Sequence, residues 1–403
     1  MKDSKMRPLS PHPLATVIGT LALVSILGGT AAQAQPAPDP GLTVEVVAKD
    51  MREETVRIPV TVKDLYGRQE TRTIPIIIFR PQGDGPFPLV VFNHGRAVPA
   101  KRATQGRSRP ETLARYLVGK GFVVMAPTRA GYAETYGDFD PEEKGSCRSP
   151  QIEPMSIAAS DQVLATVELA KTLPYVDATR WIVSGISVGG LTTVATVGRN
   201  PPGLLGGINF AGGSGGDPET QPGQPCSPNS IAHYWGGLAK TAKAPMLWLY
   251  WQNDKYWGED VPRKWHKSWT DGGGQAALTM FLPSGEDGHN GINTDMDHWL
   301  PVVDAFLGQL GFNKVAIVTK PRATNFADIA DTSKVPLSAN NQATVYAKFL
   351  EAKPPRAFAV GNRGGWGHAY GDYAAGRALG FCQRSGQACQ LYAVDDKVVW
   401  PGQ

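Results

Sequence analysis

Uninterrupted apolar runs of strand length alternate with helical patterns between residues 88 and 310, and this alternation constrains the fold more than any other feature of the sequence. Such runs are typical of strands that are buried on both faces. Strand patterns cover residues 56–62, 73–79, 88–93, 122–126, 181–184, 206–210, 244–251 and 277–282, and helical patterns cover 111–120, 156–173, 191–197, 264–270 and 299–310. The order predicts an α/β fold, with a mostly parallel sheet covered by helices on both faces.

The segment Gly185-Ile186-Ser187-Val188-Gly189 lies between one of these strands and the helix that follows it. This is a G-x-S-x-G pattern in the strand–turn–helix context that the pattern requires. A serine in such a tight turn is held above the edge of the sheet, and the two flanking glycines leave room for the close backbone. The pattern predicts that Ser187 is a nucleophile, with Gly185 and Gly189 as the glycines of the turn.

A nucleophilic serine needs a histidine base, which in sheets of this kind comes last in the chain order Ser, Asp/Glu, His. His289 follows the last predicted strand, in a loop from which it can reach the serine. His298 is the alternative, at the start of the closing helix. His94 precedes Ser187, so we expect it to brace its own loop. The order predicts His289 as the base.

The acid of the set is expected after the strand at 244–251. Asp254 lies three residues beyond that strand, where its carboxylate could hold one histidine tautomer and stabilise the imidazolium. Glu259 and Asp260 are alternatives in the same loop. A solvated turn is the structural alternative for Asp254.

Two backbone N–H groups are expected to stabilise the oxyanion that such a reaction forms. One belongs to Val188, the residue after the nucleophile. The other comes from the loop His94-Gly95-Arg96 after the strand at 88–93, where Gly95 permits a sharp turn. We predict the N–H of Arg96 as this second donor.

The His94-Gly95 pair, residues 127–132 (PTRAGY), the turn at Ser187, Asp254 and His289 together resemble the dienelactone hydrolase branch of the α/β-hydrolases, over roughly residues 70–312. The resemblance implies the α/β-hydrolase fold. Dienelactone hydrolases proper use a cysteine nucleophile, whereas this chain has serine. The resemblance therefore favours a serine esterase over an enzyme for dienelactone.

These residues predict an exported ester hydrolase that works through an acyl-enzyme and needs neither cofactor nor metal. Its partner would be a small-molecule or polymer ester, and the oligomeric state is left open. A serine peptidase or an acyltransferase would use the same residues. The alternative from another class is a non-catalytic binding protein that works through the C-terminal part of the chain.

Residues 1–34 have the features of a cleaved signal peptide: three basic residues among the first seven, an apolar run at 14–27 and Ala-Gln-Ala at 32–34. They predict a periplasmic or secreted mature chain without a membrane span. Removal of three basic residues and one acid lowers the net charge from +4 to +2. So small a charge gives no electrostatic case for binding nucleic acid or membranes.

The four cysteines are even in number, which in an exported chain suggests disulfides. Cys382 and Cys389 are close enough in sequence to close a short loop, which would leave Cys147 to pair with Cys226. Three pairings are possible, and spacing alone does not choose between them. The sequence contains no Cys/His cluster that suggests a metal site.

Residues 313–403 are expected to form a separate small α+β domain, after a catalytic domain at 35–312. Helical patterns at 341–352 and 372–383 flank a strand at 356–360 and a glycine-rich loop at 361–367, and one or two strands follow at 390–400. This part resembles a small module of exported bacterial proteins.

Two groups of side chains could shape a substrate site. Tyr256 and Trp257 flank the acid loop and could line an acyl or aryl pocket. Five basic residues crowd the loop of the second oxyanion donor: Arg96, Lys101, Arg102, Arg107 and Arg109. They could attract an acidic substrate, although charge runs are usually solvated.

Overall fold

The computed structural model describes residues 48, 51–314, 323–371, 374–383 and 387–402. The predicted signal peptide at 1–34 lies outside these residues, and the predicted domain boundaries stay predictions. Among the described residues, no helix combines the length and the apolar character needed to cross a bilayer.

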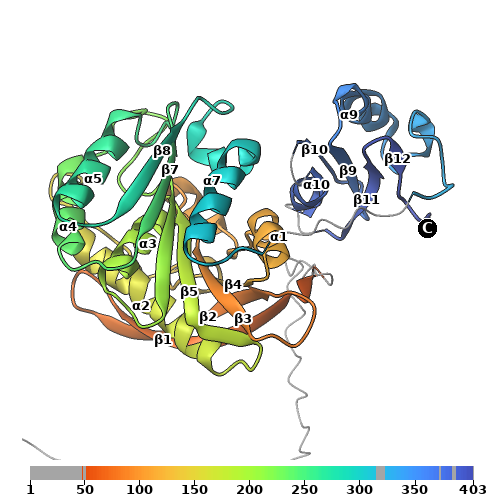
Figure 1. Ribbon diagram of the computed structural model, residues 1–403. Coiled ribbons are helices and arrows are strands. Elements are labelled where there is room, and N and C mark those ends of the chain that lie inside the picture. The colour runs from red at the N-terminus through yellow and green to blue at the C-terminus, as the bar shows by residue number, and fades with distance from the viewer. Residues whose placement is uncertain (1–47, 49–50, 315–322, 372–373, 384–386, 403) are drawn as a thin grey trace, which may run out of the picture. The chain divides into compact units, whose positions relative to one another are not determined.

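The larger part of the described chain is built on an eight-stranded sheet (Figure 1), whose strand order is β1-β2-β4-β3-β5-β6-β7-β8. Its strands are β1 (Glu54–Lys63), β2 (Gln69–Phe79), β3 (Phe87–Asn93), β4 (Val123–Pro127), β5 (Val176–Ile186), β6 (Leu204–Phe210), β7 (Met246–Trp251) and β8 (Ala276–Phe281). Strand β2 runs antiparallel to β1 and β4, and all strands from β4 to β8 are parallel. This is the α/β-hydrolase fold, which confirms the predicted fold class.

Helices cover both faces of this sheet (Figure 1). One face carries α1 (Glu111–Gly119) and α7 (Met296–Gln309), and the other carries α2 (Ile152–Lys171), α3 (Val188–Gly198), α4 (Pro228–Ala239) and α5 (Asp260–Asp271). Alternate strand residues supply the two cores: Leu89 and Val91 face the α2–α5 layer, and Val90 faces α1 and α7. The uninterrupted apolar runs of the sequence reflect this burial on both faces.

The helices and strands follow the predicted order, with one addition. Helix α4 was not predicted; it packs against α5, and its buried side chains include Ile231 and Trp235. Short helical turns complete the loops of this part: η2 (Pro99–Thr104), η3 (Ala133–Thr135), η4 (Gly288–Asn290) and α6 (Gly291–Thr294).

The C-terminal part contains a four-stranded antiparallel sheet in the order β10-β9-β11-β12. Its elements are η5 (Thr332–Lys334), α8 (Ala339–Asn341), η6 (Gln342–Tyr346), α9 (Ala347–Glu351), β9 (Arg356–Gly361), β10 (Trp366–Tyr370), α10 (Ala374–Gln383), β11 (Cys389–Val394) and β12 (Lys397–Val398). The predicted glycine-rich loop at 361–367 is too long, because Gly361 ends β9 and Trp366 and Gly367 begin β10. A Cβ on Gly367 would lie 2.3 Å from the carbonyl oxygen of Ala378, so the glycine lets α10 pack onto the strand.

Two disulfides join the four cysteines. Cys147 pairs with Cys226, with Cα atoms 5.4 Å apart, and Cys382 pairs with Cys389 at 6.1 Å. The first bond links the loop before α2 to the loop before α4, and the second links α10 to β11.

Candidate active site

Ser187 lies in the turn between β5 and α3, with a backbone φ of +58°. Residues other than glycine rarely adopt this conformation, and such strain is concentrated at functional sites. Its N–H donates to the Phe210 carbonyl at 3.0 Å, and its own carbonyl accepts from the N–H groups of Leu191 and Gly213 at 3.0 and 3.1 Å. These bonds to the first turn of α3 and to the end of β6 hold the turn in its strained form.

The two glycines that flank the serine are required by close backbone contacts. A Cβ on Gly189 would lie 2.0 Å from the carbonyl oxygen of Asn93, and one on Gly185 would lie 2.3 Å from the carbonyl oxygen of Gly189. No side chain fits at such distances. The serine turn is therefore packed directly against the end of β3.

Asp254 and His289 are in direct contact, although 35 residues separate them. The Nδ1 atom of His289 lies 3.0 Å from Oδ2 of Asp254 and 3.2 Å from Oδ1. The carboxylate is 2% exposed. Its Oδ1 also accepts the N–H groups of Tyr256 and Trp257 at 2.7 and 3.1 Å. A carboxylate so placed selects the histidine tautomer that has its proton on Nδ1 and leaves Nε2 free to accept one.

The loops that carry these two residues are held together by a second carboxylate. Oδ1 of Asp287 accepts the N–H of His289 at 3.0 Å and that of Lys255 at 2.9 Å. The side-chain amide of Asn253 adds bonds to the N–H of Ser284 and the carbonyl of Gly285. Sequence reasoning missed both Asp287 and Asn253. The position of Asp287 two residues before His289 was the available signal.

Tyr256 and Trp257, the two predicted pocket aromatics, both contact His289. The Tyr256 ring stacks on the imidazole, and the Trp257 ring meets it edge-on with centroids 5.5 Å apart. The Trp257 indole N–H donates to the Ala211 carbonyl at 2.7 Å, two residues before Gly213, which bonds Ser187. The aromatic pair thus connects the histidine loop to the serine turn.

Ser187, Asp254 and His289 all follow carboxyl ends of parallel strands, namely β5, β7 and β8. Ligands of open α/β sheets bind along this edge. The Ser187 hydroxyl makes no hydrogen bond to any described residue, and its side chain is largely buried. Catalytic hydrogen bonds often tighten only when a substrate is present.

The alternative residues lie elsewhere. Nδ1 of His298 bonds Asp295 at the exposed start of α7, and this carboxylate raises the pKa of His298. Glu259 forms an exposed ion pair with Arg263, and Asp260 begins α5. Within the described chain, none of the three is hydrogen-bonded to Asp254 or His289.

Two backbone N–H groups beside Ser187 are without acceptors in the described part of the chain. The N–H of Val188 is the first of α3, where no helix carbonyl can accept it. The N–H of Arg96 follows Gly95, whose built Cβ would lie 3.1 Å from Cβ of Ser187. Both predicted oxyanion donors thus lie next to the serine.

The loop of Arg96 rests on a buried ion pair that sequence reasoning missed. Arg129 and Glu142 are fully buried and form a salt bridge. The Tyr132 hydroxyl donates to Glu142 at 2.6 Å, and burial together with this carboxylate raises the Tyr132 pKa. One guanidinium nitrogen of Arg129 donates to the carbonyl of His94 at 3.0 Å. The only sequence signal was the PTRAGY segment that contains Arg129 and Tyr132.

The basic residues of this loop are mostly paired with acids from distant segments. Arg96 and Arg102 bind Asp140, Arg107 binds Glu134, and Arg109 binds Glu53. Arginines held in this way offer little charge to an incoming acid. The structure therefore favours the structural interpretation of the cluster over recognition of an acidic substrate.

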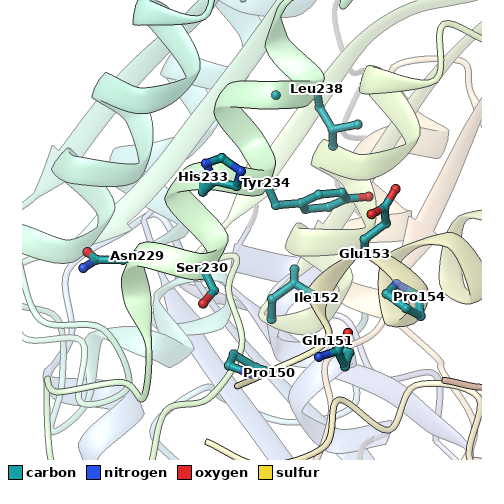
Figure 2. A pocket seen from close by; sticks show the side chains of 11 residues that line it. Pro150, Gln151, Ile152, Glu153, Pro154, Asn229, Ser230, His233, Tyr234 and Leu238 are labelled. Carbon is teal, nitrogen blue, oxygen red and sulfur yellow. The ribbon is translucent and has the colours of Figure 1, made fainter. Parts of the chain in front are cut away.

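One cavity of the structure is lined by neighbours of Ser187, and another is lined by none of the candidate site residues. One, of about 390 Å³, is lined by Gly95 and Ile186, the neighbours of Ser187, and by apolar side chains that include Phe92, Leu113 and Ile292. The other, of about 700 Å³, lies between the start of α2 and helix α4 (Figure 2). There, the Tyr234 ring points toward Glu153 (Figure 2), and none of the site residues above lines this cavity.

The described residues contain no group of three or more His, Cys, Asp or Glu side chains that could hold a metal ion. The backbone N–H groups of Val188 and Arg96 lie beside Ser187, and the imidazole of His289 is bonded to Asp254 at the same edge of the sheet. Such a set can activate a hydroxyl and stabilise an oxyanion.

Solved structures with a similar chain path include hydrolases of several kinds. A protein assigned as a dienelactone hydrolase from Klebsiella pneumoniae is 16% identical, with a TM-score of 0.41 over 64% of this chain and 98% of its own. A Pyrococcus horikoshii acylaminoacyl peptidase is 17% identical, with a TM-score of 0.45 over 67% of this chain and 43% of its own. A Pyrococcus furiosus esterase is 12% identical, with a TM-score of 0.45 over 65% and 93%.

No protein-family model and no curated protein matches the sequence. The likeness to these solved structures is one of fold.

Proposed function

We propose that the chain is a serine hydrolase that cleaves carboxylic esters through an acyl-enzyme, with Ser187 as nucleophile, His289 as base and Asp254 as the orienting acid. The observation that carries the proposal is the strained turn of Ser187 at the sheet edge where Asp254 and His289 are bonded. Strain of this size is kept only where the surrounding structure enforces it. The proposed reaction explains why the strained turn is present, because this turn holds the Ser187 hydroxyl clear of the sheet.

In the first step the Ser187 oxygen attacks the ester carbonyl carbon, and its proton passes to Nε2 of His289. The Nδ1–H of the imidazolium donates to Asp254, which stabilises the positive charge. The carbonyl oxygen becomes an oxyanion and is held by the N–H groups of Val188 and Arg96. The proton then goes to the departing alkoxide, which leaves as the alcohol. Water next attacks the acyl carbon and gives a proton to His289, and the bond to Ser187 breaks as the serine oxygen takes that proton back and the acid leaves.

The cavity beside Gly95 and Ile186 suggests the kind of ester. Its lining combines apolar side chains with Arg107 and Arg109, and these two arginines are engaged by Glu134 and Glu53. A free carboxylate would have to compete with these ion pairs. We therefore expect neutral esters with short to medium acyl chains to be better substrates than monoesters of dicarboxylic acids.

Export is the second part of the proposal. The Cys147–Cys226 and Cys382–Cys389 bonds are compatible with an oxidising compartment. A periplasmic or secreted location would also suit an enzyme that acts on small-molecule or polymer esters from outside the cell.

The test is hydrolysis of p-nitrophenyl acetate, butyrate and decanoate by the protein and by Ser187→Ala. We expect kcat/KM to fall by about 10⁴-fold or more in the variant. Ser230→Ala on α4 is the matched control, because Ser230 lines the groove of Figure 2 and none of the cavity beside Ser187. This control should keep the activity of the unmodified protein.

A fluorophosphonate probe gives a readout that does not depend on the choice of ester. One adduct on the peptide that contains Ser187 is expected from mass spectrometry, and none in Ser187→Ala. A protein that hydrolyses no ester and takes up no probe would contradict the proposed function, as would an active Ser187→Ala.

A further inference from the structure

We propose that the side chains of Gln105 and His94 fix the peptide between Gly95 and Arg96, and thereby aim the Arg96 N–H at the oxyanion. Gln105 is then a positioning residue of the site, and no sequence motif identifies it. This inference rests on the proposed function, because it assigns the Arg96 N–H a part in the reaction.

Gln105 follows the short helical turn η2 and reaches back along its own loop. Its Nε2 donates to the carbonyl oxygen of Gly95 at 3.0 Å, and its Oε1 accepts the N–H of Ala97 at 2.8 Å. The two partners leave no choice of amide orientation, since a backbone N–H can only donate and a carbonyl can only accept. One side chain therefore binds the peptide groups on both sides of Arg96.

His94 holds the same carbonyl, with its Nδ1 atom 3.4 Å from Nε2 of Gln105. Its Nε2 accepts the N–H of Arg129 at 3.1 Å, so the ring proton is on Nδ1, which donates to the Gly95 carbonyl at 2.6 Å. Burial and the Arg129 charge hold the His94 pKa well below its usual range, which keeps the ring neutral in this tautomer. Arg129 is itself fixed by the buried Glu142.

The consequence follows from the geometry of the peptide group. A trans peptide is planar, and its C=O and N–H point in opposite directions. Two donors that hold the Gly95 carbonyl on one side therefore direct the Arg96 N–H to the other side. Within the described residues this N–H has no acceptor of its own. Gly95 itself lies close to the serine, since a Cβ on Gly95 would be 3.1 Å from Cβ of Ser187.

The side chain of Arg96 prevents the residue from rotating away. Its guanidinium binds Asp140 and donates to the Tyr132 hydroxyl at 3.2 Å. The side chain is thus engaged by Asp140 and Tyr132, whereas the main-chain N–H has no acceptor among the described residues. A donor that is fixed before the substrate arrives costs no reorganisation when the oxyanion forms.

The experiment compares Gln105→Leu and Gln105→Glu with Thr104→Ala. Leucine removes both bonds, whereas glutamate keeps an acceptor for the Ala97 N–H and loses the donor to the Gly95 carbonyl. Thr104 is exposed in the same turn and bonds only the Lys101 carbonyl, so its variant loosens the loop without touching the peptide at Arg96. The readouts are kcat and KM for p-nitrophenyl butyrate, thermal unfolding, and inhibition by an alkyl trifluoromethyl ketone, which forms an oxyanion on Ser187.

We expect both Gln105 variants to lose about 10²-fold to 10³-fold in kcat, the usual effect of one oxyanion donor. KM should change less than about threefold, and the trifluoromethyl ketone should bind more weakly by a similar factor to the loss in kcat. Thr104→Ala should match the unmodified protein in all three. A merely structural Gln105 would shift the melting temperature without moving kcat and ketone binding together.

The outcomes separate this inference from the function on which it rests. If the unmodified protein hydrolyses esters through Ser187 and folded Gln105→Glu keeps its full kcat, the positioning role is overturned and the serine hydrolase stands. If Gln105→Leu alone fails to fold, Gln105→Glu decides. If the unmodified protein neither hydrolyses esters nor binds the fluorophosphonate, both proposals fail.

Discussion

The phenol ring of Tyr256 stacks on the imidazole of His289, with ring centroids 4.0 Å apart and planes inclined by 28°. Asp254 sets both partners of this stack, because its Oδ1 accepts the Tyr256 N–H while both oxygens face Nδ1 of His289. One carboxylate therefore fixes the tautomer of the histidine and the position of the ring that covers it.

Asp254→Asn should separate these two roles. Asparagine keeps an oxygen for the N–H groups of Tyr256 and Trp257, so the turn should survive, but its neutral amide cannot stabilise an imidazolium. We expect kcat for p-nitrophenyl esters to fall by about 10⁴-fold with a small change in melting temperature. Glu259→Gln, at the exposed pair with Arg263, is the control and should be fully active. Equal activity of Asp254→Asn and the unmodified protein would exclude Asp254 as the acid.

Because the φ of Ser187 is positive, we expect its replacement by glycine to relieve backbone strain and stabilise the fold. Both Ser187→Ala and Ser187→Gly should abolish activity, but only glycine accepts a φ of +58° without steric cost. The strain of such a residue is about 1–3 kcal/mol, partly offset by the larger freedom of glycine in the unfolded chain. Urea unfolding should therefore show Ser187→Gly more stable than Ser187→Ala by about 1 kcal/mol. The reverse order would mean that the turn is relaxed.

Gly189→Ala tests the packing of the turn against β3. Its Cβ would lie 2.0 Å from the Asn93 carbonyl oxygen, which is backbone and cannot move aside cheaply. We expect a loss of about 3 kcal/mol or more in the free energy of unfolding, together with loss of activity. Gly237→Ala in α4 is the matched control, since no atom lies within 4 Å of its built Cβ. That change should instead stabilise the helix by about 0.5–1 kcal/mol. Similar stabilities of the two variants would contradict the predicted contact.

The buried His94 predicts a loss of stability in acid. Its pKa in the folded protein lies well below the ordinary 6.5, so the unfolded chain binds the proton more readily. The stability that neutral His94 contributes is therefore complete above pH 6.5 and is lost as the pH falls below that value. The slope from this one group approaches about 1.4 kcal/mol per pH unit.

Urea unfolding between pH 5 and 7.5 measures this slope, which should be smaller in His94→Asn. His298→Gln is the opposite control, because Asp295 raises the His298 pKa. The stability from His298 is present below pH 6.5 and lost as the pH rises through the raised pKa of the folded protein. Its removal should make the acid loss slightly steeper. An unchanged slope in His94→Asn would show that His94 is not held neutral.

The parts of the site that could be predicted from the sequence are those that local backbone geometry requires. Ser187 is marked by two glycines that steric contact makes necessary, and the parallel strand order brings Asp254 and His289 to the same edge. The contacts that support them are harder to predict. Gln105 is an ordinary glutamine in a loop, and its role depends on a chain reversal that no periodic pattern records.

The same limit applies to charge and to short elements. The sequence does not show the acidic partners of the five basic residues, because these partners, such as Asp140 and Glu53, come from distant segments. The predicted loop at 361–367 includes the first two residues of β10 because glycines usually interrupt strands, whereas Gly367 makes room for α10. Helix α4 was missed because Gly236 and Gly237 weaken its helical pattern, although packing against α5 stabilises it.

Every residue proposed to react or to aim a donor lies at the carboxyl edge of the large sheet, and this has a practical use. The loops that enter the parallel strands lie at the opposite edge, and one of them presents the exposed Lys243 just before β7. A solid support coupled through Lys243 would leave the serine facing the bulk solution. Immobilised in this way, the protein should keep the turnover of the free form, whereas coupling through the loop of Lys101 should obstruct access for the ester.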